Sequence, residues 1–215
     1  VPAPGADHAE TLDHHADALP IVQIGGRQTS PHVSVVGIDE GVAMETVIRH
    51  LAGQGIASVA YMAGDELSFE SAELFAMFHT YLRTYELSTD EDWNRFGACT
   101  VQRGFDCAMR LFNGPIVQPE AVVCADDTIA FGVMVALNTL GVRVPEDVLV
   151  VGYHDSPIAR TTMPQLTSMR APFERIVSEC LRLLASKQTY DADERAPRIM
   201  LAPRLIARGS SMLRS

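Results

Sequence analysis

The feature that most constrains this chain is a regular alternation of short apolar segments with segments of helical periodicity. Six apolar runs have the length of buried strands, and most of them lead into an amphipathic helix. Apolar strands that alternate with helices form parallel sheets covered on both faces. We therefore predict an α/β fold with doubly wound parallel sheets. The predicted strands occupy residues 20–26, 32–39, 58–64, 121–127, 148–155 and 165–170.

Apolar residues three or four positions apart predict the helices between these strands. The first helix begins after Asp39 and ends before Gly53, and Pro172 marks the first turn of the last one. Two extended segments, residues 198–203 and 204–209, close the chain. The expected helical residues are Met44, Val47, Ile48 and Leu51; Leu74, Phe75, Phe78, Tyr81, Leu82 and Tyr85; Phe105, Met109 and Phe112; Ile129, Ala130, Val133, Met134 and Leu137; and Phe173, Ile176, Val177, Cys180 and Leu184.

Composition and charge exclude several classes of protein. With 215 residues, 47% of them hydrophobic and 20% charged, the chain can bury a core. No apolar run approaches the roughly 18 residues of a membrane span, and no signal segment opens the chain. A net charge of −10 argues against nucleic-acid binding by this piece itself, because phosphate contacts need a basic face. The first residue is Val1 rather than Met, so we expect a fragment of a longer protein.

The usual sequence signals of catalysis and metal binding are absent. There is no GxSxG, GxGxxG, HExxH or phosphate loop, so we expect no enzyme and no cofactor. The four cysteines, Cys99, Cys107, Cys124 and Cys180, lack zinc-ligand spacing. Three of them have apolar neighbours in sequence and are expected to be buried thiols of a reducing compartment. One acidic and histidine-rich segment falls around a helix rather than along one stripe, which favours a solvated face over a metal site. Its residues are Asp7, His8, Asp13, His14, His15 and Asp17.

Polar side chains follow three of the predicted strands, where an open α/β sheet binds its ligands. Gly64 and Asp65 follow the strand at 58–62, and His154 follows the strand at 148–152. After the strand at 121–125, we expect Asp127 to cap the next helix. Asp126 is free either to face a ligand or to hydrogen-bond within its loop.

Residues 121–172 carry a specific run of motifs. They read AVVCADDTIAFGVMVALNTLGVRVPEDVLVVGYHDSPIARTTMPQLTSMRAP. This run resembles the LacI/GalR family of bacterial transcription regulators, which shows a CANDxxAxG-like turn, then GxxVPEDVSVVGFDD and PxLTTVRxP. Three shorter segments, VIRHLAGQGIASVAYMAG, CTVQRGFDCAM and RIMLAPRLIARGSS, resemble further stretches of that family. The resemblance therefore covers nearly the whole chain.

The resemblance implies two interleaved subdomains of periplasmic-binding-protein-like type, with the N-terminal subdomain incomplete in this chain. The N-terminal subdomain is expected at residues 1–54 and 171–190, and the C-terminal subdomain at 55–170 and 191–215. The family's members close on a small effector, a sugar-like compound or another metabolite, in the cleft between the subdomains. They bind operator DNA through a helix-turn-helix, which these residues do not contain.

The resemblance also implies a cytoplasmic homodimer that acts as a repressor. We expect the dimer to form through the helix that carries Met44, Val47 and Leu51. The alternative is that these three side chains only pack on their own sheet.

The family's effector positions fall on residues that depart from its usual sugar-binding pattern. Leu74 stands where an arginine usually clamps the sugar, and Cys99 stands at an aromatic or polar pocket position. Asp126 stands where the family has an asparagine. The family also has two consecutive aspartates, the DD of GFDD; His154 stands in place of the first, and Asp155 matches the second. Leucine donates no hydrogen bond, whereas a guanidinium offers a fork of donors. The resemblance therefore implies a pocket with few fixed donors, and we expect weak or no binding of simple hexoses. Either the ligand is less rich in hydroxyl groups than a sugar, or the site has decayed.

Two other function classes remain open on the sequence alone. An exported, periplasmic-type small-molecule binding protein shares the architecture, but it would need an export signal before Val1. A doubly wound enzyme would need a catalytic set that we do not find. The sequence of the preceding residues distinguishes the first alternative from a regulator, since it would contain either a signal peptide or a helix-turn-helix.

Overall fold

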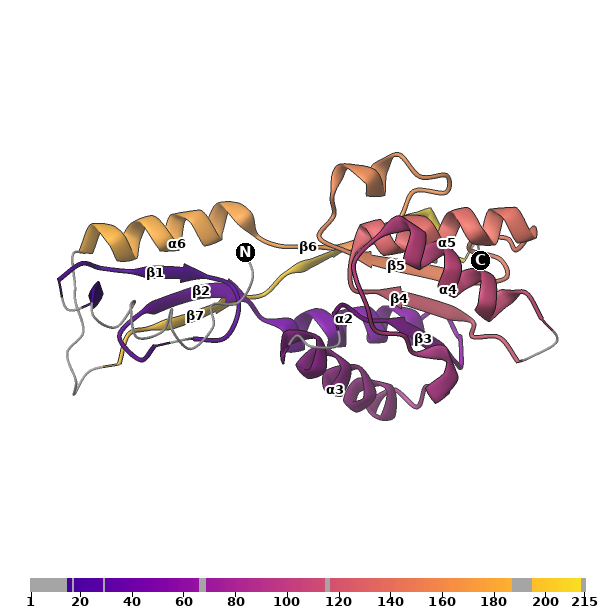
Figure 1. Ribbon diagram of the computed structural model, residues 1–215, viewed down its shortest axis with the longest axis horizontal. Helices are drawn as coiled ribbons and strands as arrows, with labels where there is room; N and C mark the ends of the chain where they lie inside the picture. The colour runs from indigo at the N-terminus through magenta and orange to yellow at the C-terminus, as the bar shows by residue number, and fades with distance from the viewer. Residues whose placement is uncertain are drawn as a thin grey trace. The chain divides into compact units, whose positions relative to one another are not determined.

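The computed structural model describes residues 15–16, 18–28, 30–65, 69–114, 117–186 and 195–213. The chain divides into two compact units that interleave along the sequence (Figure 1). Unit 1 comprises Val1–Asp39 and Pro172–Pro203, and unit 2 comprises Glu40–Ala171 and Arg204–Ser215.

The unit boundaries differ from those expected at two places. Residues 40–54 belong to unit 2, because the helix α2 (Glu40–Ala52) buries its apolar face against the sheet of that unit. Residues 191–203 belong to unit 1, because the strand β7 (Arg198–Leu201) pairs with β2 (Ser34–Ile38). The return to unit 1 at Pro172 lies one residue from its expected position.

Unit 1 contains a three-stranded parallel sheet with one helix upon it. The strands β1 (Val22–Ile24), β2 and β7 follow one another in the order β1-β2-β7. The helix α6 (Phe173–Ser186) packs on β1 and β2, and its buried side chains are Ile176, Cys180 and Leu183. Their spacing of four and three residues places them on one stripe of the helix.

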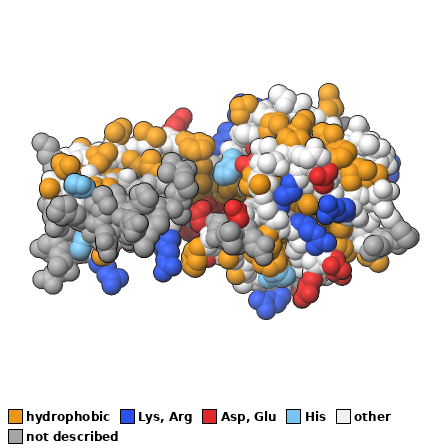
Figure 2. All heavy atoms as spheres, in the orientation of Figure 1, with side chains coloured by type: hydrophobic (Ala, Val, Ile, Leu, Met, Phe, Trp, Pro, Cys, Tyr) orange, Lys and Arg blue, Asp and Glu red, His pale blue; other side chains and the backbone are white. Residues whose placement is uncertain are grey.

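A second side of α6, next to the buried stripe, is also apolar, and it is exposed. Hydrophobic side chains run along this helix in the face that Figure 2 shows. Two of them, Val177 and Leu184, belong to the same predicted helical pattern as the buried residues, yet their exposed fractions are 53% and 41%. The sequence pattern therefore identifies the helix correctly, but it does not distinguish the buried apolar residues from the exposed ones. The exposed residues are Phe173, Val177, Leu181 and Leu184.

Unit 2 is built on a five-stranded sheet in the order β3-β4-β5-β6-β8. Its first four strands pair in parallel, which confirms the predicted parallel sheet, and β8 pairs antiparallel with β6. The strands are β3 (Val59–Met62), β4 (Ala121–Cys124), β5 (Leu149–Tyr153), β6 (Thr167–Arg170) and β8 (Arg204–Ile206).

Helices cover both faces of this sheet, as the apolar strands require. On one face, α2 and α3 (Phe69–Thr84) enclose an apolar cluster around Tyr61 and Phe78 (Figure 1). On the other face, α4 (Val101–Phe112) and α5 (Asp127–Leu140) enclose a cluster that includes Ile129 and Leu137. Three short 3-10 helices complete the unit, at Glu91–Trp93, Pro157–Arg160 and Gly209–Ser211.

Two glycines let the backbones of α4 and α5 touch. A Cβ atom on Gly104 would lie 2.1 Å from the carbonyl oxygen of Ile129, and one on Gly132 would lie 2.0 Å from that of Val101. Neither position can hold a side chain without separating the helices. Within the described residues, no helix has the length and hydropathy to cross a bilayer.

Candidate functional site

The candidate site lies where the first three strands of the unit 2 sheet end. Since β3, β4 and β5 pair in parallel, their carboxyl ends share one edge. Gly64, Asp126 and His154 follow these strands in turn. Loops and helix N-termini converge at such an edge, which is where open α/β sheets bind ligands.

Asp126 and His154 face each other across this edge. Oδ2 of Asp126 lies 3.8 Å from Nε2 of His154, and the exposed fractions of the two side chains are 24% and 52%. The other oxygen, Oδ1, accepts the backbone N–H of Thr128 at 2.6 Å and thereby caps α5. Asp126 therefore has one oxygen in the loop hydrogen bond that its sequence position allowed and the other toward His154, while contact with a ligand stays a prediction.

The expectation that Asp127 caps the helix is wrong by one residue. Asp127 lies within the first turn and is 1% exposed. Its carboxylate accepts the Ser168 hydroxyl and the Ser156 backbone N–H, each at 2.6 Å, which ties α5 to β6 and to the loop after β5. A Cβ on residue 152 would lie 2.4 Å from Oδ1 of Asp127, so Gly152 makes room for this carboxylate. Burial raises the pKa of Asp127, although the hydrogen bonds from Ser168 and Ser156 oppose that shift.

The backbone after β5 adopts a conformation that L-residues rarely take. His154 has φ of 92° and Asp155 has φ of 47°. Two hydrogen bonds hold this turn, from the His154 N–H to the Met169 carbonyl at 2.8 Å and from the Asp155 N–H to Oγ of Ser168 at 2.9 Å. Such strain persists only where the surroundings fix it, and it is concentrated at functional sites.

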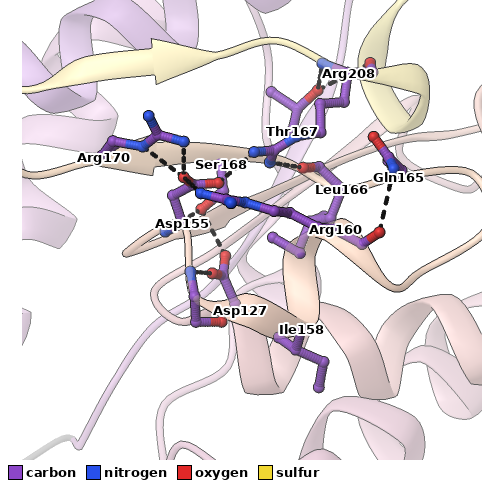
Figure 3. Close-up of polar contacts among 12 residues, drawn as sticks. Asp127, Asp155, Ile158, Arg160, Gln165, Leu166, Thr167, Ser168, Arg170 and Arg208 are labelled. Carbon is purple, nitrogen blue, oxygen red and sulfur yellow. Dashed lines mark hydrogen bonds and ion pairs between the residues drawn. The ribbon is translucent and has the colours of Figure 1, made fainter.

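Asp155 is buried among three arginines (Figure 3). Nε of Arg170 donates to Oδ2 at 2.6 Å, Nη2 of Arg208 donates to Oδ1 at 2.5 Å, and Nη2 of Arg160 lies 3.5 Å from Oδ2. Burial would raise the pKa of Asp155, but hydrogen bonds and charge from Arg208 and Arg170 outweigh it and lower the pKa. With its side chain 1% exposed and both oxygens occupied, Asp155 positions the strained turn rather than presenting itself to a ligand.

The two remaining expected site residues occupy different surroundings. Cys99 is exposed, and its Sγ lies 4.0 Å from an ideal Cβ on Gly64, at the end of β3. Partial burial and the negative charge of Asp126 raise the pKa of the Cys99 thiol, while the positive charge of Arg103 opposes that shift. Cys99 therefore interacts electrostatically with charged residues of the same sheet edge. Leu74 is half-buried on α3 and packs against the apolar cluster around Tyr61.

Sequence reasoning missed two further groups at this edge. Arg103, in the first turn of α4, donates to the backbone carbonyls of Ala63 and Arg95. Its Nε is buried without a hydrogen-bond partner in the described structure. Glu40, at the start of α2, accepts the hydroxyl of Tyr153 at the end of β5. The contacts from Arg103 to Ala63 and from Tyr153 to Glu40 join segments far apart in sequence, so no local sequence pattern predicts them.

No group of three or more metal-ligating side chains occurs among the residues that the structure describes. The acidic and histidine-rich segment considered above lies outside those residues except for His15, which is exposed.

The comparisons with known proteins agree with this architecture. The sequence profile described as the periplasmic binding protein-like domain matches residues 48–211. The chain is similar to the HTH-type transcriptional repressor PurR of Vibrio cholerae, with 26% identity over 184 residues. That similarity covers 83% of this chain and 52% of the relative, so the chain spans about half the length of the curated relatives it matches.

Solved structures show the same likeness. A LacI transcriptional regulator from a Rhodococcus species matches with a TM-score of 0.78 and 26% identity, over 94% of this chain and 74% of that one. The dimeric Lac repressor with an 11-residue C-terminal deletion matches in fold, with a TM-score of 0.79 and 23% identity over 96% and 74% of the two chains.

Proposed function

Because the chain belongs to the periplasmic binding protein-like domain family and corresponds to the effector-binding region of LacI/GalR regulators, we propose that it is the sensing part of a transcription repressor. A small metabolite binds it, and this binding controls the affinity of a helix-turn-helix outside these residues for operator DNA. The whole protein acts in the cytoplasm. The observation that carries the proposal is the partly exposed pair of Asp126 and His154 at the carboxyl edge of the unit 2 sheet.

The side chains at this edge favour an effector with fewer hydroxyl groups than a hexose. Asp126 has one oxygen that the helix cap leaves free, and His154 offers a ring nitrogen. Leu74 supplies an apolar side chain, and the carboxylate of Asp155 is held by its arginines. A site without fixed partners for a ligand's polar groups binds that ligand poorly, because those groups lose their water without replacement. We therefore expect weak binding of simple hexoses.

Native mass spectrometry of the purified protein, followed by calorimetry, tests this proposal. We expect a small molecule to accompany the protein through purification, and calorimetry with that compound and with a hexose panel gives the affinities. Asp126→Ala and His154→Ala should each weaken binding of the compound by about tenfold or more, because each removes a polar partner.

The matched control is Asp147→Ala, since Asp147 lies before β5, at the opposite edge of the sheet, and pairs there with Arg143. This variant should bind the compound as the unaltered protein does. Tight hexose binding that neither Asp126→Ala nor His154→Ala affects would contradict the assigned site.

We also propose that the intact protein is a homodimer, because the Lac repressor that it matches in fold is a dimeric form. Met44, Val47 and Leu51 are between 0% and 3% exposed and pack within unit 2, so these three side chains are not contact residues of a dimer. An interface through the outward side of α2 and its neighbours stays a prediction. Light scattering of the intact protein at tens of micromolar should give the dimer mass, and a monomer mass would contradict the proposal.

A repressor is favoured over an exported binding protein by the similarity to PurR, which is a transcriptional repressor. Sequencing of the codons that precede Val1 tests this choice. A helix-turn-helix pattern there supports the repressor, and a signal peptide supports the exported protein.

A further inference from the structure

A separate cavity of about 600 Å³ lies within unit 2. Its walls come from residues 88–95 and from one side of α4. Residues 88–95 run beside β3 through parallel bridges from Ser58 to Ser88 and from Met62 to Arg95. The volume falls within the range of about 300–1,000 Å³ that is usual for small-molecule sites. None of the candidate effector residues lines it, so this cavity is distinct from the site proposed above.

Part of the cavity wall is apolar. Met62 and Trp93 belong to the buried cluster under α4, with exposed fractions of 0% and 8%. Cys107 and Leu111 lie one helical turn apart on α4 and add to this surface, as does the exposed Val117. Because Met62 and Trp93 are buried already, an apolar group of a ligand would displace water from Cys107, Leu111 and Val117, which is favourable in proportion to the area covered.

The cavity wall also holds two acidic and two basic side chains. Among the described residues, none of these four has an ion-pair partner within 4.0 Å. Figure 2 shows basic side chains over α4 with acidic ones beside them on the same face of unit 2. The four residues are Asp90, Asp92, Arg95 and Arg110.

Most of the hydrogen-bonding capacity of these groups is unused. Oδ1 of Asp90 accepts the Asp92 N–H at 2.8 Å, which leaves Oδ2 available. Nη1 of Arg95 donates to the Asn94 carbonyl at 2.9 Å, which leaves its other N–H groups available. Arginine binds carboxylates through two parallel hydrogen bonds, and a carboxylate accepts hydrogen bonds from an ammonium group.

We propose that this cavity binds a free α-amino acid with a large apolar side chain. The ligand's carboxylate pairs with the arginines, its ammonium group pairs with the aspartates, and its side chain packs against Cys107, Leu111 and Val117, next to the edge of Trp93. All four charged residues are exposed and hydrated in the free protein, so a neutral apolar ligand that covered them would remove water without supplying charged partners. A ligand with a single charge would satisfy one pair and leave the other unpaired.

Fluorescence of Trp93 tests the proposal directly, because Trp93 is the only tryptophan of the chain. Titration of the full chain with L-phenylalanine should give a saturable change in its emission. Two analogues serve as ligand controls: 3-phenylpropionate lacks the ammonium group, and phenethylamine lacks the carboxylate. Each should bind at least about tenfold more weakly than L-phenylalanine, because each loses its charged hydrogen bonds on one side.

Protein variants assign the response to this cavity. Arg110→Gln and Asp92→Asn should each weaken L-phenylalanine binding by about tenfold. Arg83→Gln, which removes an exposed arginine of α3 outside the cavity, should leave it unchanged. The proposal is overturned by the absence of a saturable change up to about 10 mM L-phenylalanine, where even weak sites fill. Equal binding of the analogues, or unaltered binding by both cavity variants, also overturns it.

Discussion

At the scale of single residues, Asp155 fixes the turn on which the candidate site depends. Its carboxylate joins β6 through Arg170 and the C-terminal segment through Arg208, while its own backbone is left-handed. His154 precedes it in the same strained turn, so the direction of the imidazole depends on that ion network. Removal of one member of a buried network leaves the others uncompensated, which costs more than the loss of a surface pair.

We predict that Asp155→Asn lowers the free energy of unfolding by about 3 kcal/mol, because Arg208, 11% exposed, would keep its charge without a partner. Urea denaturation at neutral pH measures the change. Asp147→Asn, which breaks the exposed pair with Arg143, is the control and should change stability little. Equal effects of the two substitutions would contradict a special role for Asp155.

The two buried aspartates should give stability opposite dependences on pH. The pKa of Asp155 is lowered, so its contribution is present above the ordinary aspartate value of about 3.9 and is lost as the pH falls through the folded-state value. The pKa of Asp127 is raised, so its contribution is present below the ordinary value and is lost as the pH rises through the folded-state value. Urea denaturation across acidic pH gives the free energy of unfolding of Asp155→Asn, of Asp127→Asn and of the unaltered protein. The difference between each variant and the unaltered protein should change with pH in opposite directions for the two variants. Slopes of the same sign would show that one of these assignments is wrong.

The strained backbone of His154 gives a further prediction. His154→Gly should be more stable than His154→Ala by about 1 kcal/mol, because glycine adopts φ near 92° without the steric cost that a Cβ brings. Both variants lose the imidazole, so the comparison isolates the backbone. Thermal unfolding of the two proteins measures it, and a more stable alanine variant would show that the turn is relaxed.

At the scale of elements, the sequence predicts the helices and strands, because local hydrophobic periodicity determines them. Each predicted strand and helix in the described residues is present, because apolar alternation and caps act over a few residues. The predicted cap of the helix after β4 is wrong by one residue, since Asp126 and Asp127 are chemically equivalent as caps. The proximity of Asp126 to His154 follows from the parallel sheet, whereas the cluster around Asp155 does not. Arg208 reaches Asp155 only because β8 pairs antiparallel with β6, and no local pattern encodes that pairing.

The contact between α4 and α5 gives the prediction at this scale. Gly132→Ala should lower the free energy of unfolding by about 3 kcal/mol or more, because its Cβ would lie 2.0 Å from one backbone atom of α4 and 2.8 Å from another. The control is Gly114→Ala, where a Cβ meets nothing within 4 Å. Urea denaturation compares the two variants. A tolerated Gly132→Ala would show that the helices separate at little cost.

At the scale of the whole molecule, the interleaving of the two units determines which segments a ligand at the candidate site can affect. The chain crosses from one unit to the other after Asp39, Ala171 and Pro203. The strained turn at His154 is hydrogen-bonded to β6, whose end at Arg170 directly precedes the second of these crossings. A ligand that contacts His154 would therefore act on a segment close to a crossing, and under the function proposed above a change of conformation there would couple effector binding to operator binding.

The charge of the molecule gives the last prediction, which concerns DNA. The chain carries a net charge of −10, and phosphate binding requires a basic face, so these residues alone should select no sequence from a pool of randomised duplexes. Fluorescence anisotropy at low and moderate salt measures any residual affinity. For a protein that contacts Z phosphates, a plot of the logarithm of the binding constant against the logarithm of the salt concentration has a slope of about −0.9Z. For these residues that slope should be near zero. Selection of one duplex, together with a steep salt dependence, would place the DNA-binding surface within this chain and would contradict its role as a sensing part alone.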